Sequence, residues 1–188
     1  PGGGAEIFDE EVRAKICKGK VSSENWLKIH KMWHDKGRQS NATMLFGHIE
    51  SRENRIDHML RIRDLQDETG GFNAFIPLVY QRENNYLKDV KFLGSAEILK
   101  TMAISRLVLD NVPHIKAYWA TSTLNLAMIA QEFGADDLDG TIEKESIQSA
   151  AGANSANGVT LKTFCDLIKT SGFTPVERDS LYNELKIY

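Results

Sequence analysis

The sequence predicts an α/β fold in which parallel strands alternate with helices, and three observations support this prediction. Short apolar runs bounded by turn residues recur along the chain, helical stripes of apolar residues lie between them, and glycines follow the ends of those stripes. Strands joined by helices of this length form right-handed crossovers and a parallel sheet. Three such strands are expected to form half of a (β/α)8 barrel, with open sheet edges that need a cover.

The first quarter of the chain is predicted to fold as helix, helix and strand. Residues 9–17 form a short helix, and Ser23 caps a second helix that runs to about residue 35. The apolar run NATMLF at residues 41–46, closed by Gly47, is typical of a buried strand. The buried stripe of the second helix is expected to comprise Trp26, Ile29 and Trp33.

A charged helix over residues 52–68 follows, and Gly70 is expected to end it in a left-handed conformation. The run FNAFI at residues 72–76 predicts the second strand, which Pro77 is expected to terminate. The buried stripe of this helix is expected to comprise Ile56, Met59 and Leu60.

The third strand and its flanking helices are predicted next. Ser95 caps a broadly apolar, buried helix over residues 96–109, and HIKAYW at residues 114–119 is the strand. A further helix ends at Gly134, and GADDLDGT at residues 134–141 fits either a last short strand or a loop. The stripe of that helix is expected to comprise Leu126, Ile129, Ala130 and Phe133.

The C-terminal segment is predicted to be helical. One helix is marked by Leu161, Phe164, Cys165 and Ile168. The run TPVE at residues 174–177 has the pattern of a capping box with proline at the first helical position, which predicts a final helix. The chain is therefore divided into a partial barrel at residues 1–143 and a helical extension at residues 144–188 packed on it.

Composition and charge narrow the function. The chain is 41% hydrophobic and 26% charged, and its net charge of -3 argues against a nucleic-acid partner bound through many phosphates. No apolar run approaches the roughly 18 residues that cross a bilayer, and no signal segment heads the chain, so a cytoplasmic protein without membrane contact is expected. Cys17 and Cys165 support neither a disulfide framework nor a metal site in this chain.

The turn after the first predicted strand is a candidate site, because working residues in (β/α) barrels lie where strands end. Gly47 would let the backbone approach a ligand, and His48 or Glu50 could hydrogen-bond to it. A turn in which Glu50 caps the next helix is the alternative.

The third predicted strand carries an unexpected charge. Alternation puts His114, Lys116 and Tyr118 on one face, although a parallel strand is normally apolar on both faces. An unpaired lysine buried there would cost on the order of several kcal/mol, so an anionic partner is expected, from the protein or from a ligand carboxylate. The alternative is an edge strand whose lysine reaches water.

Polar clusters elsewhere are weaker candidates. Asp137 and Asp139 could hydrogen-bond to ribose or ammonium groups, or could cap a loop; they lack the spacing of a calcium loop. His30 and His34 have the spacing of zinc ligands, but without a third ligand two surface histidines are expected.

Several segments together resemble a known family across nearly the whole chain. They are PGGGAEIF, SNATMLFGHIES, RIRDLQDETGGFNAFIPL, RLVLDNVPHIKAYW, FGADDLDGT and PVERDSLY. They resemble the C-terminal half of the aminofutalosine synthase family, radical S-adenosylmethionine enzymes of the futalosine route to menaquinone. HIKAYW with GADDLDGT favours this family over two relatives, the cyclic dehypoxanthine futalosine synthases and the deazaflavin-forming synthases of coenzyme F420.

The resemblance implies a transferase of the radical S-adenosylmethionine class with a barrel fold. A [4Fe-4S] cluster and S-adenosylmethionine would supply a 5′-deoxyadenosyl radical that adds to 3-[(1-carboxyvinyl)oxy]benzoate, and rearrangement with decarboxylation gives aminodeoxyfutalosine. TMLFGHIE is similar to the family's G-x-I-x-G-x-x-E element, in which Gly47 and Glu50 match while Thr43 replaces the first glycine. The implied cofactor contacts are Gly47, His48 and Glu50, and the implied substrate contacts are Asn73, Lys116, Tyr118, Asp137 and Asp139.

The CxxxCxxC motif of the family is missing, and Cys17 and Cys165 cannot replace its three thiolates. The chain is therefore expected to be a fragment, inert alone, whose partner is a missing N-terminal half with the cluster ligands. The opening glycines are expected to follow a strand lost before Pro1, because a glycine-rich loop of this kind needs a strand in front of it. The rival hypothesis is a binding or scaffold module without chemistry that forms a homodimer through its open sheet edges.

Overall fold

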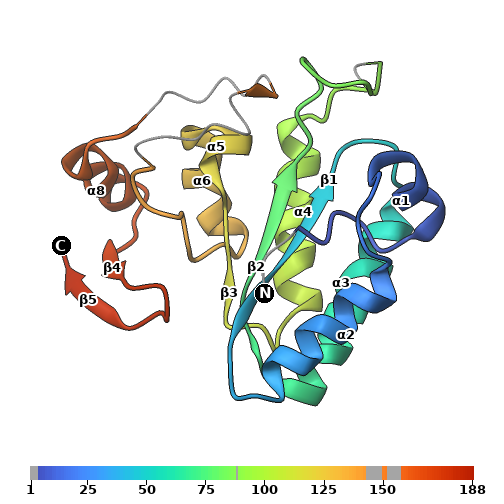
Figure 1. The fold of residues 1–188 in the computed structure, drawn as a ribbon. Helices are drawn as coiled ribbons and strands as arrows, with labels where there is room; N and C mark the ends of the chain where they lie inside the picture. Colours follow the sequence, from blue (N-terminus) through green and yellow to red (C-terminus); the bar gives the residue numbers. More distant parts are fainter. Residues whose placement is uncertain (1–3, 88, 143–149, 152–157) are drawn as a thin grey trace.

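A three-stranded parallel sheet forms the centre of the computed structural model, which describes residues 4–87, 89–142, 150–151 and 158–188. Its order is β1-β2-β3, with β1 at Ser40–Phe46, β2 at Phe72–Val79 and β3 at His114–Ile115. The connecting helices α3 (Arg52–Thr69) and α4 (Ser95–Val108) lie along the same side of the sheet (Figure 1). The α/β class and the parallel sheet are confirmed, and the strand–helix order is that of a partial (β/α) barrel.

The other helices flank this unit. They are α1 (Glu10–Ile16), α2 (Ser23–His34), α5 (Trp119–Ser122), α6 (Leu124–Ala130), the short 3-10 helix η1 (Gln131–Phe133) and α8 (Leu161–Thr170). Ser22, not Ser23, caps α2, because Ser23 donates its N–H and hydroxyl to Glu10 and so ties α2 to α1. Gly94 precedes α4, so the predicted Ser95 cap is wrong by one residue.

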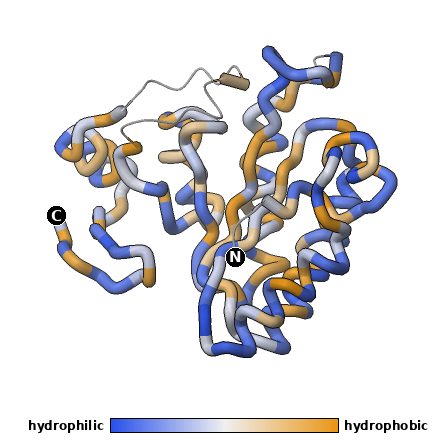
Figure 2. The backbone as a smooth tube through the Cα atoms, viewed as in Figure 1, coloured by the Kyte–Doolittle hydropathy of each residue, from blue (hydrophilic) through white to orange (hydrophobic). Residues whose placement is uncertain are grey.

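The two faces of the sheet differ in burial. On the face that α3 and α4 cover, Ala42, Met44, Phe46 and Phe75 are fully buried. The opposite face, here called the open face, is only partly covered by the described part of the chain. The register places on it Asn41, Thr43 and Leu45 of β1, Ala74, Ile76 and Leu78 of β2, and His114 with Lys116 at β3. The central strands are largely hydrophobic, whereas the outer helices carry both kinds of residue (Figure 2).

The N-terminal segment lies beside the outer edge of β1. Leu45 donates its N–H to the Glu6 carbonyl (2.7 Å), and Ala5 donates its N–H to Thr43 Oγ1 (2.9 Å). This edge of the sheet is therefore partly covered by the chain itself. Of the opening glycines, Gly2 and Gly3 lie outside the described residues, and Gly4 begins the described segment.

Pro77 lies inside β2 and does not terminate it, so that prediction is wrong. Lys116 donates its N–H to the Phe75 carbonyl (2.9 Å), so Phe75 and, by alternation, Pro77 direct their main-chain nitrogens toward β3. Because β3 ends at Ile115, the missing N–H of Pro77 falls beyond the paired part of that edge, where proline is tolerated.

Several helical stripes are rotated relative to the predictions. The exposed members, between 38% and 50% exposed, are Ile29, Leu60, Ile129, Phe133 and Leu161. In α4, which was expected to be buried, Leu107 is 77% exposed. In α2 the buried residues include His30 and His34, so the prediction of surface histidines is wrong. With 3.6 residues per turn, the apolar residues of these helices can be assigned to more than one adjacent face. The position of the sheet determines which face is buried.

The third strand is shorter than the predicted range 114–119. Past Ile115, only Lys116 continues the ladder, in one parallel bridge to Asp137, and α5 begins at Trp119. Of the two alternatives for residues 134–141, the structure therefore shows a loop that contributes a single strand-like position beside β3.

The predicted final helix is wrong, because a hairpin occupies this segment. Strand β4 (Val176–Arg178) pairs antiparallel with β5 (Glu184–Ile187), and Tyr188 donates its N–H to the Pro175 carbonyl (3.0 Å). Hydrogen bonds to β5 satisfy the backbone groups of β4. In a helix, the capping box would have satisfied some of these groups instead. The C-terminal extension thus holds α8 and a hairpin, and the predicted boundary at residue 143 falls outside the described residues.

Candidate active site

The carboxyl ends of β1 and β2 and the segment after β3 enclose a cavity of about 290 Å³. Gly47 lines it after β1, and residues 79–83 line it at and after β2. Residues 90–93 and the start of α4 form another wall, and residues 120–123 line it from α5 and the position that follows. Ligands of open α/β sheets and barrels bind at the carboxyl ends of the strands. Of the residues that the sequence placed in the site, Gly47 lines this cavity.

Glu50 organises the turn after β1 from within. Its side chain is fully buried, and its carboxylate accepts the N–H groups of Gly47 (2.6 Å) and His48 (2.8 Å). Arg55 of α3 donates to the same carboxylate through Nε (2.8 Å), and its NH2 lies 2.7 Å away. Burial alone would raise the pKa of Glu50, but the His48 ring, the Gly47 amide and Arg55 lower it to about 2. The carboxylate is therefore held ionised inside the protein.

These contacts bear on the predicted cofactor contacts. A Cβ on Gly47, whose φ is +89°, would meet the Leu93 side chain at 2.9 Å, so this glycine permits a close approach by the protein itself. The His48 ring is held by the Leu45 carbonyl at Nε2 (3.0 Å) and lies 3.0 Å from Glu50 at Nδ1. The alternative, a turn whose role is structural, accounts for these contacts within the protein. The cofactor role of Gly47, His48 and Glu50 stays a prediction.

Lys116 has the anionic protein partners that its burial requires. It is 5% exposed, donates to Asp139 Oδ1 (2.6 Å) and lies 4.0 Å from Asp137 Oδ2. The Asp139 N–H donates to Asp137 Oδ1 (2.8 Å), which fixes the two carboxylates relative to each other. Burial alone would raise the pKa of Asp137, but Lys116, this amide and its other partners lower it. The alternative in which Lys116 reaches water is wrong.

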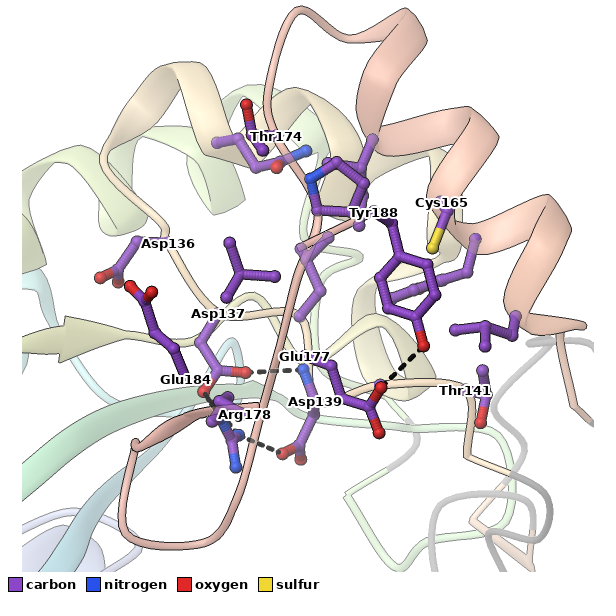
Figure 3. Close-up of a pocket in the computed structure, with 18 of the residues that line it drawn as sticks. Asp136, Asp137, Asp139, Thr141, Cys165, Thr174, Glu177, Arg178, Glu184 and Tyr188 are labelled. Carbon is purple, nitrogen blue, oxygen red and sulfur yellow. Dashed lines mark hydrogen bonds and ion pairs between the residues drawn. The ribbon is translucent and has the colours of Figure 1, made fainter. Parts of the chain in front are cut away.

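The C-terminal hairpin completes this cluster. Arg178 donates to Asp137 Oδ2 through Nε (3.1 Å) and NH2 (2.6 Å) and also lies 3.6 Å from Asp139 (Figure 3). Tyr182 packs its ring against the Arg178 guanidinium at 4.3 Å and stacks on His114 at 4.0 Å. Sequence reasoning missed both residues, although both lie in PVERDSLY, a segment that carried the resemblance.

A larger cavity of about 500 Å³ lies between this cluster and α8 (Figure 3). Carboxylates of Asp136 and Glu177 lie on its polar side, and Phe164 and Ile168 of α8 provide an apolar side. Most of its polar groups already have partners: Asp136 pairs with Arg106 (2.9 Å), and Glu177 accepts the hydroxyl of Tyr188 (2.7 Å).

The structure does not bring all predicted substrate contacts together. Lys116, Asp137 and Asp139 form one cluster, whereas Asn73 lies at the amino end of β2 beside a register shift. Val79, at the other end of β2, is about 20 Å from Asn73 at about 3.3 Å per residue. Tyr118 is the residue before α5, and its carbonyl accepts the hydroxyl of Thr121. The substrate roles of these five residues stay predictions.

The described residues do not fit an iron–sulfur cluster. No group of three or more His, Cys, Asp or Glu side chains among them could hold a metal ion. Cys17 is half-buried and Cys165 is buried, and two thiols cannot supply the three thiolates of a radical S-adenosylmethionine cluster. In the part of the chain that the structure describes, no helix is both long enough and apolar enough to span a bilayer.

The sheet and the polar groups at its carboxyl end define the class: an α/β protein with the architecture of a partial (β/α) barrel and a candidate site where the strands end. Residues 69–188 match the family described as the CofH/MqnC C-terminal region. The chain belongs to this family, and the predicted resemblance is confirmed.

Relatives of known name agree with this assignment. The chain is 50% identical over 192 residues to an aminodeoxyfutalosine synthase of Thermus thermophilus and 45% identical over 198 residues to one of Streptomyces coelicolor. It is 40% identical over 188 residues to a cyclic dehypoxanthine futalosine synthase of Streptomyces coelicolor. All of this chain is covered, but only 52%, 51% and 46% of these relatives, so it spans about half their length.

Proposed function

We propose that this chain is the C-terminal half of an aminodeoxyfutalosine synthase in menaquinone biosynthesis. The observation that carries the proposal is the 50% identity over the whole chain to an enzyme of that name, against 40% to a cyclic dehypoxanthine futalosine synthase. The whole protein would add the 5′-deoxyadenosyl group of S-adenosylmethionine to 3-[(1-carboxyvinyl)oxy]benzoate, with rearrangement and decarboxylation. It would do so in the cytoplasm.

Within that protein, this chain would contribute binding groups at the strand ends. The ligands of the [4Fe-4S] cluster would lie in an N-terminal half, because the described residues cannot provide them. The open face, with Thr43 and Leu45 only partly buried, supports a covering partner of this kind. Without that half the chain would be inactive.

Lys116 would hold a carboxylate of the substrate. Its buried ammonium lies on the open face, and a substrate carboxylate would replace Asp139 as its nearest partner. The side chain of Asp139 is 30% exposed and that of Asp137 is 7% exposed, so Asp139 is the partner that can turn away. The turn at Gly47, His48 and Glu50 would shape the wall beside S-adenosylmethionine.

The test is an anaerobic assay of the whole protein with reconstituted cluster, S-adenosylmethionine, reductant and 3-[(1-carboxyvinyl)oxy]benzoate. Aminodeoxyfutalosine in the product mixture, identified by mass spectrometry, is the expected result. A protein that binds the cluster and cleaves S-adenosylmethionine but converts only the substrate of a cyclic dehypoxanthine futalosine synthase would contradict the proposal.

A variant pair tests the lysine. Lys116→Ala is expected to raise the KM for the benzoate substrate at least about tenfold, since a buried charge-assisted hydrogen bond contributes on the order of 1.5–3 kcal/mol. The KM for S-adenosylmethionine should change little. Lys100→Ala, on the exposed side of α4, is the matched control. Equal effects on both KM values would remove the proposed role of Lys116.

A further inference from the structure

We propose that Arg178, carried into the site by the C-terminal hairpin, is a positioning residue that leaves Lys116 free to bind an anion. Arg178 pairs with Asp137, so that Lys116 has only Asp139 as a close carboxylate partner. The cluster of Lys116, Arg178, Asp137 and Asp139 then has no net charge. This inference rests on the proposed function, because it assigns the anion at Lys116 to the substrate.

The distances show how the four charges divide into two pairs. Arg178 NH2 lies 2.6 Å from Asp137 Oδ2, and Lys116 Nζ lies 2.6 Å from Asp139 Oδ1. The crossed separations are longer, at 4.0 Å for Lys116 to Asp137 and 3.6 Å for Arg178 to Asp139. Each base therefore has one near acid, and the two pairs lie in contact with each other.

The hairpin is fastened to the third strand, so Arg178 has a defined place. Tyr182 stacks on His114 with an angle of 8° between the rings, and its ring also packs against the Arg178 guanidinium. Burial next to Asp137 raises the pKa of the Tyr182 hydroxyl, which therefore stays neutral and adds no charge to the cluster. The sheet, the loop after it and the chain terminus meet at this one point.

Removal of Arg178 has two consequences for an anionic ligand. The cluster of Lys116, Arg178, Asp137 and Asp139 is neutral, and without the guanidinium it carries one negative charge that repels a carboxylate. Asp137 would also lose its nearest cation and draw Lys116 across the 4.0 Å gap, so that the ammonium is shared by two protein carboxylates. Arg106 and His114 do not replace the lost cation, because both are paired with Asp136.

A second substitution that restores the neutral charge of the cluster separates this role from simple packing. In the whole enzyme, Arg178→Met should raise the KM for the carboxylate substrate at least tenfold while the KM for S-adenosylmethionine changes less than twofold. Arg178→Lys should retain most of the affinity. The double variant Arg178→Met/Asp137→Asn restores neutrality and should recover the substrate KM to within about threefold. Melting temperature and iron content are measured for each variant.

A second measurement does not depend on the identity of the substrate. In a crystal structure of the Arg178→Met variant, Lys116 Nζ should lie within hydrogen-bond distance of both Asp137 and Asp139. An unchanged separation from Asp137 would overturn the inference, and so would a double variant that folds and loads iron without recovering affinity. If the wild-type enzyme does not convert the benzoate substrate, the proposed function fails, while the position of Lys116 in the variant still decides the role of Arg178.

Discussion

Glu50 and Arg55 form an ion pair inside the protein, with Arg55 NH2 2.7 Å from Glu50 Oε1 and the Glu50 side chain fully buried. Arg55 extends the contact to α4, where it meets Glu97 (3.1 Å) and Thr101 (3.2 Å). The turn after β1, the start of α3 and the start of α4 are therefore joined by one charged group. This network fixes the shape of the strand end at which a ligand would bind.

Glu50→Ala is expected to lower the free energy of unfolding by about 3–5 kcal/mol, because it leaves Nε and NH2 of Arg55 and two backbone amides without their acceptor. Denaturant unfolding measures the loss. Glu53→Ala, an exposed position in the first turn of α3, is the control and should cost less than about 1 kcal/mol. A loss for Glu50→Ala as small as that of the control would show that the pair does not support the turn.

Gly71 is expected to tolerate no side chain. A Cβ there would lie 2.1 Å from Cγ of His34, whose ring is held in place by hydrogen bonds to Thr69 and Ser40 (both 2.8 Å). Gly71→Ala should destabilise the protein by about 1–3 kcal/mol, the usual cost of overpacking. Gly94→Ala, where the added methyl meets nothing within 4 Å, should be nearly neutral. Equal melting temperatures for the two variants would contradict the expectation.

His30 and His34 are buried and both hydrogen-bond to the Ser40 hydroxyl. Their hydrogen bonds fix which ring nitrogen of each histidine carries the proton. The Thr69 hydroxyl donates to the Leu65 carbonyl (2.8 Å), so it accepts from Nδ1 of His34. Nε2 of His34 is then the acceptor for Ser40, and Ser40 accepts from Nδ1 of His30. Both rings are neutral in this arrangement, and an added proton would break it.

This arrangement predicts loss of stability in acid. Burial lowers the pKa of His30 to about 4 and that of His58 to about 3, against 6.5 for an ordinary histidine, and it also lowers the pKa of His34. The unfolded chain then binds more protons than the folded chain below pH 6.5. Stability is therefore complete above pH 6.5 and falls as the pH drops toward 4, by about 1.4 kcal/mol per pH unit for each such histidine.

Unfolding at pH 7.0, 6.0 and 5.0 measures this slope. His30→Gln should reduce the slope by the contribution of one histidine, since His34 and His58 remain. His114→Gln, in a half-buried histidine stacked on Tyr182, should leave the slope in place. Stability that is constant from pH 7 to pH 5 would contradict the neutral arrangement.

The loop that carries Asp137 and Asp139 is held by an indole. Trp119 Nε1 donates to the Gly140 carbonyl (2.9 Å), and Trp119 is 2% exposed. Trp119→Phe should cost about 1–3 kcal/mol, because it removes this hydrogen bond and shrinks a buried side chain. Trp33→Phe also removes an indole N–H, from the Gln39 carbonyl (3.0 Å), but at an exposed site where water replaces it. A smaller loss for Trp119→Phe than for Trp33→Phe, by calorimetry, would argue against this anchor.

The sequence predicted the two long strands and the left-handed Gly70, and both are confirmed. It left open whether Lys116 meets an anion or reaches water, and the structure decides for the anion. It did not predict the hairpin at residues 176–187, because a capping box is a local signal and β5 supplies distant partners. Nor did it predict Arg178, since an arginine near a chain end looks like a solvated charge until Asp137 is seen beside it.

By itself, the sequence determined the order of strands and helices through the third strand, the parallel sheet and the family, because periodicity, turn residues and long matching segments are local properties of the chain. Only the tertiary structure decided which helical stripe faces the sheet, that His30 and His34 are buried, and which acid neutralises which base at Lys116. Burial and charge pairing depend on residues that lie far apart in the chain. They contribute to stability only after folding has brought those residues into contact.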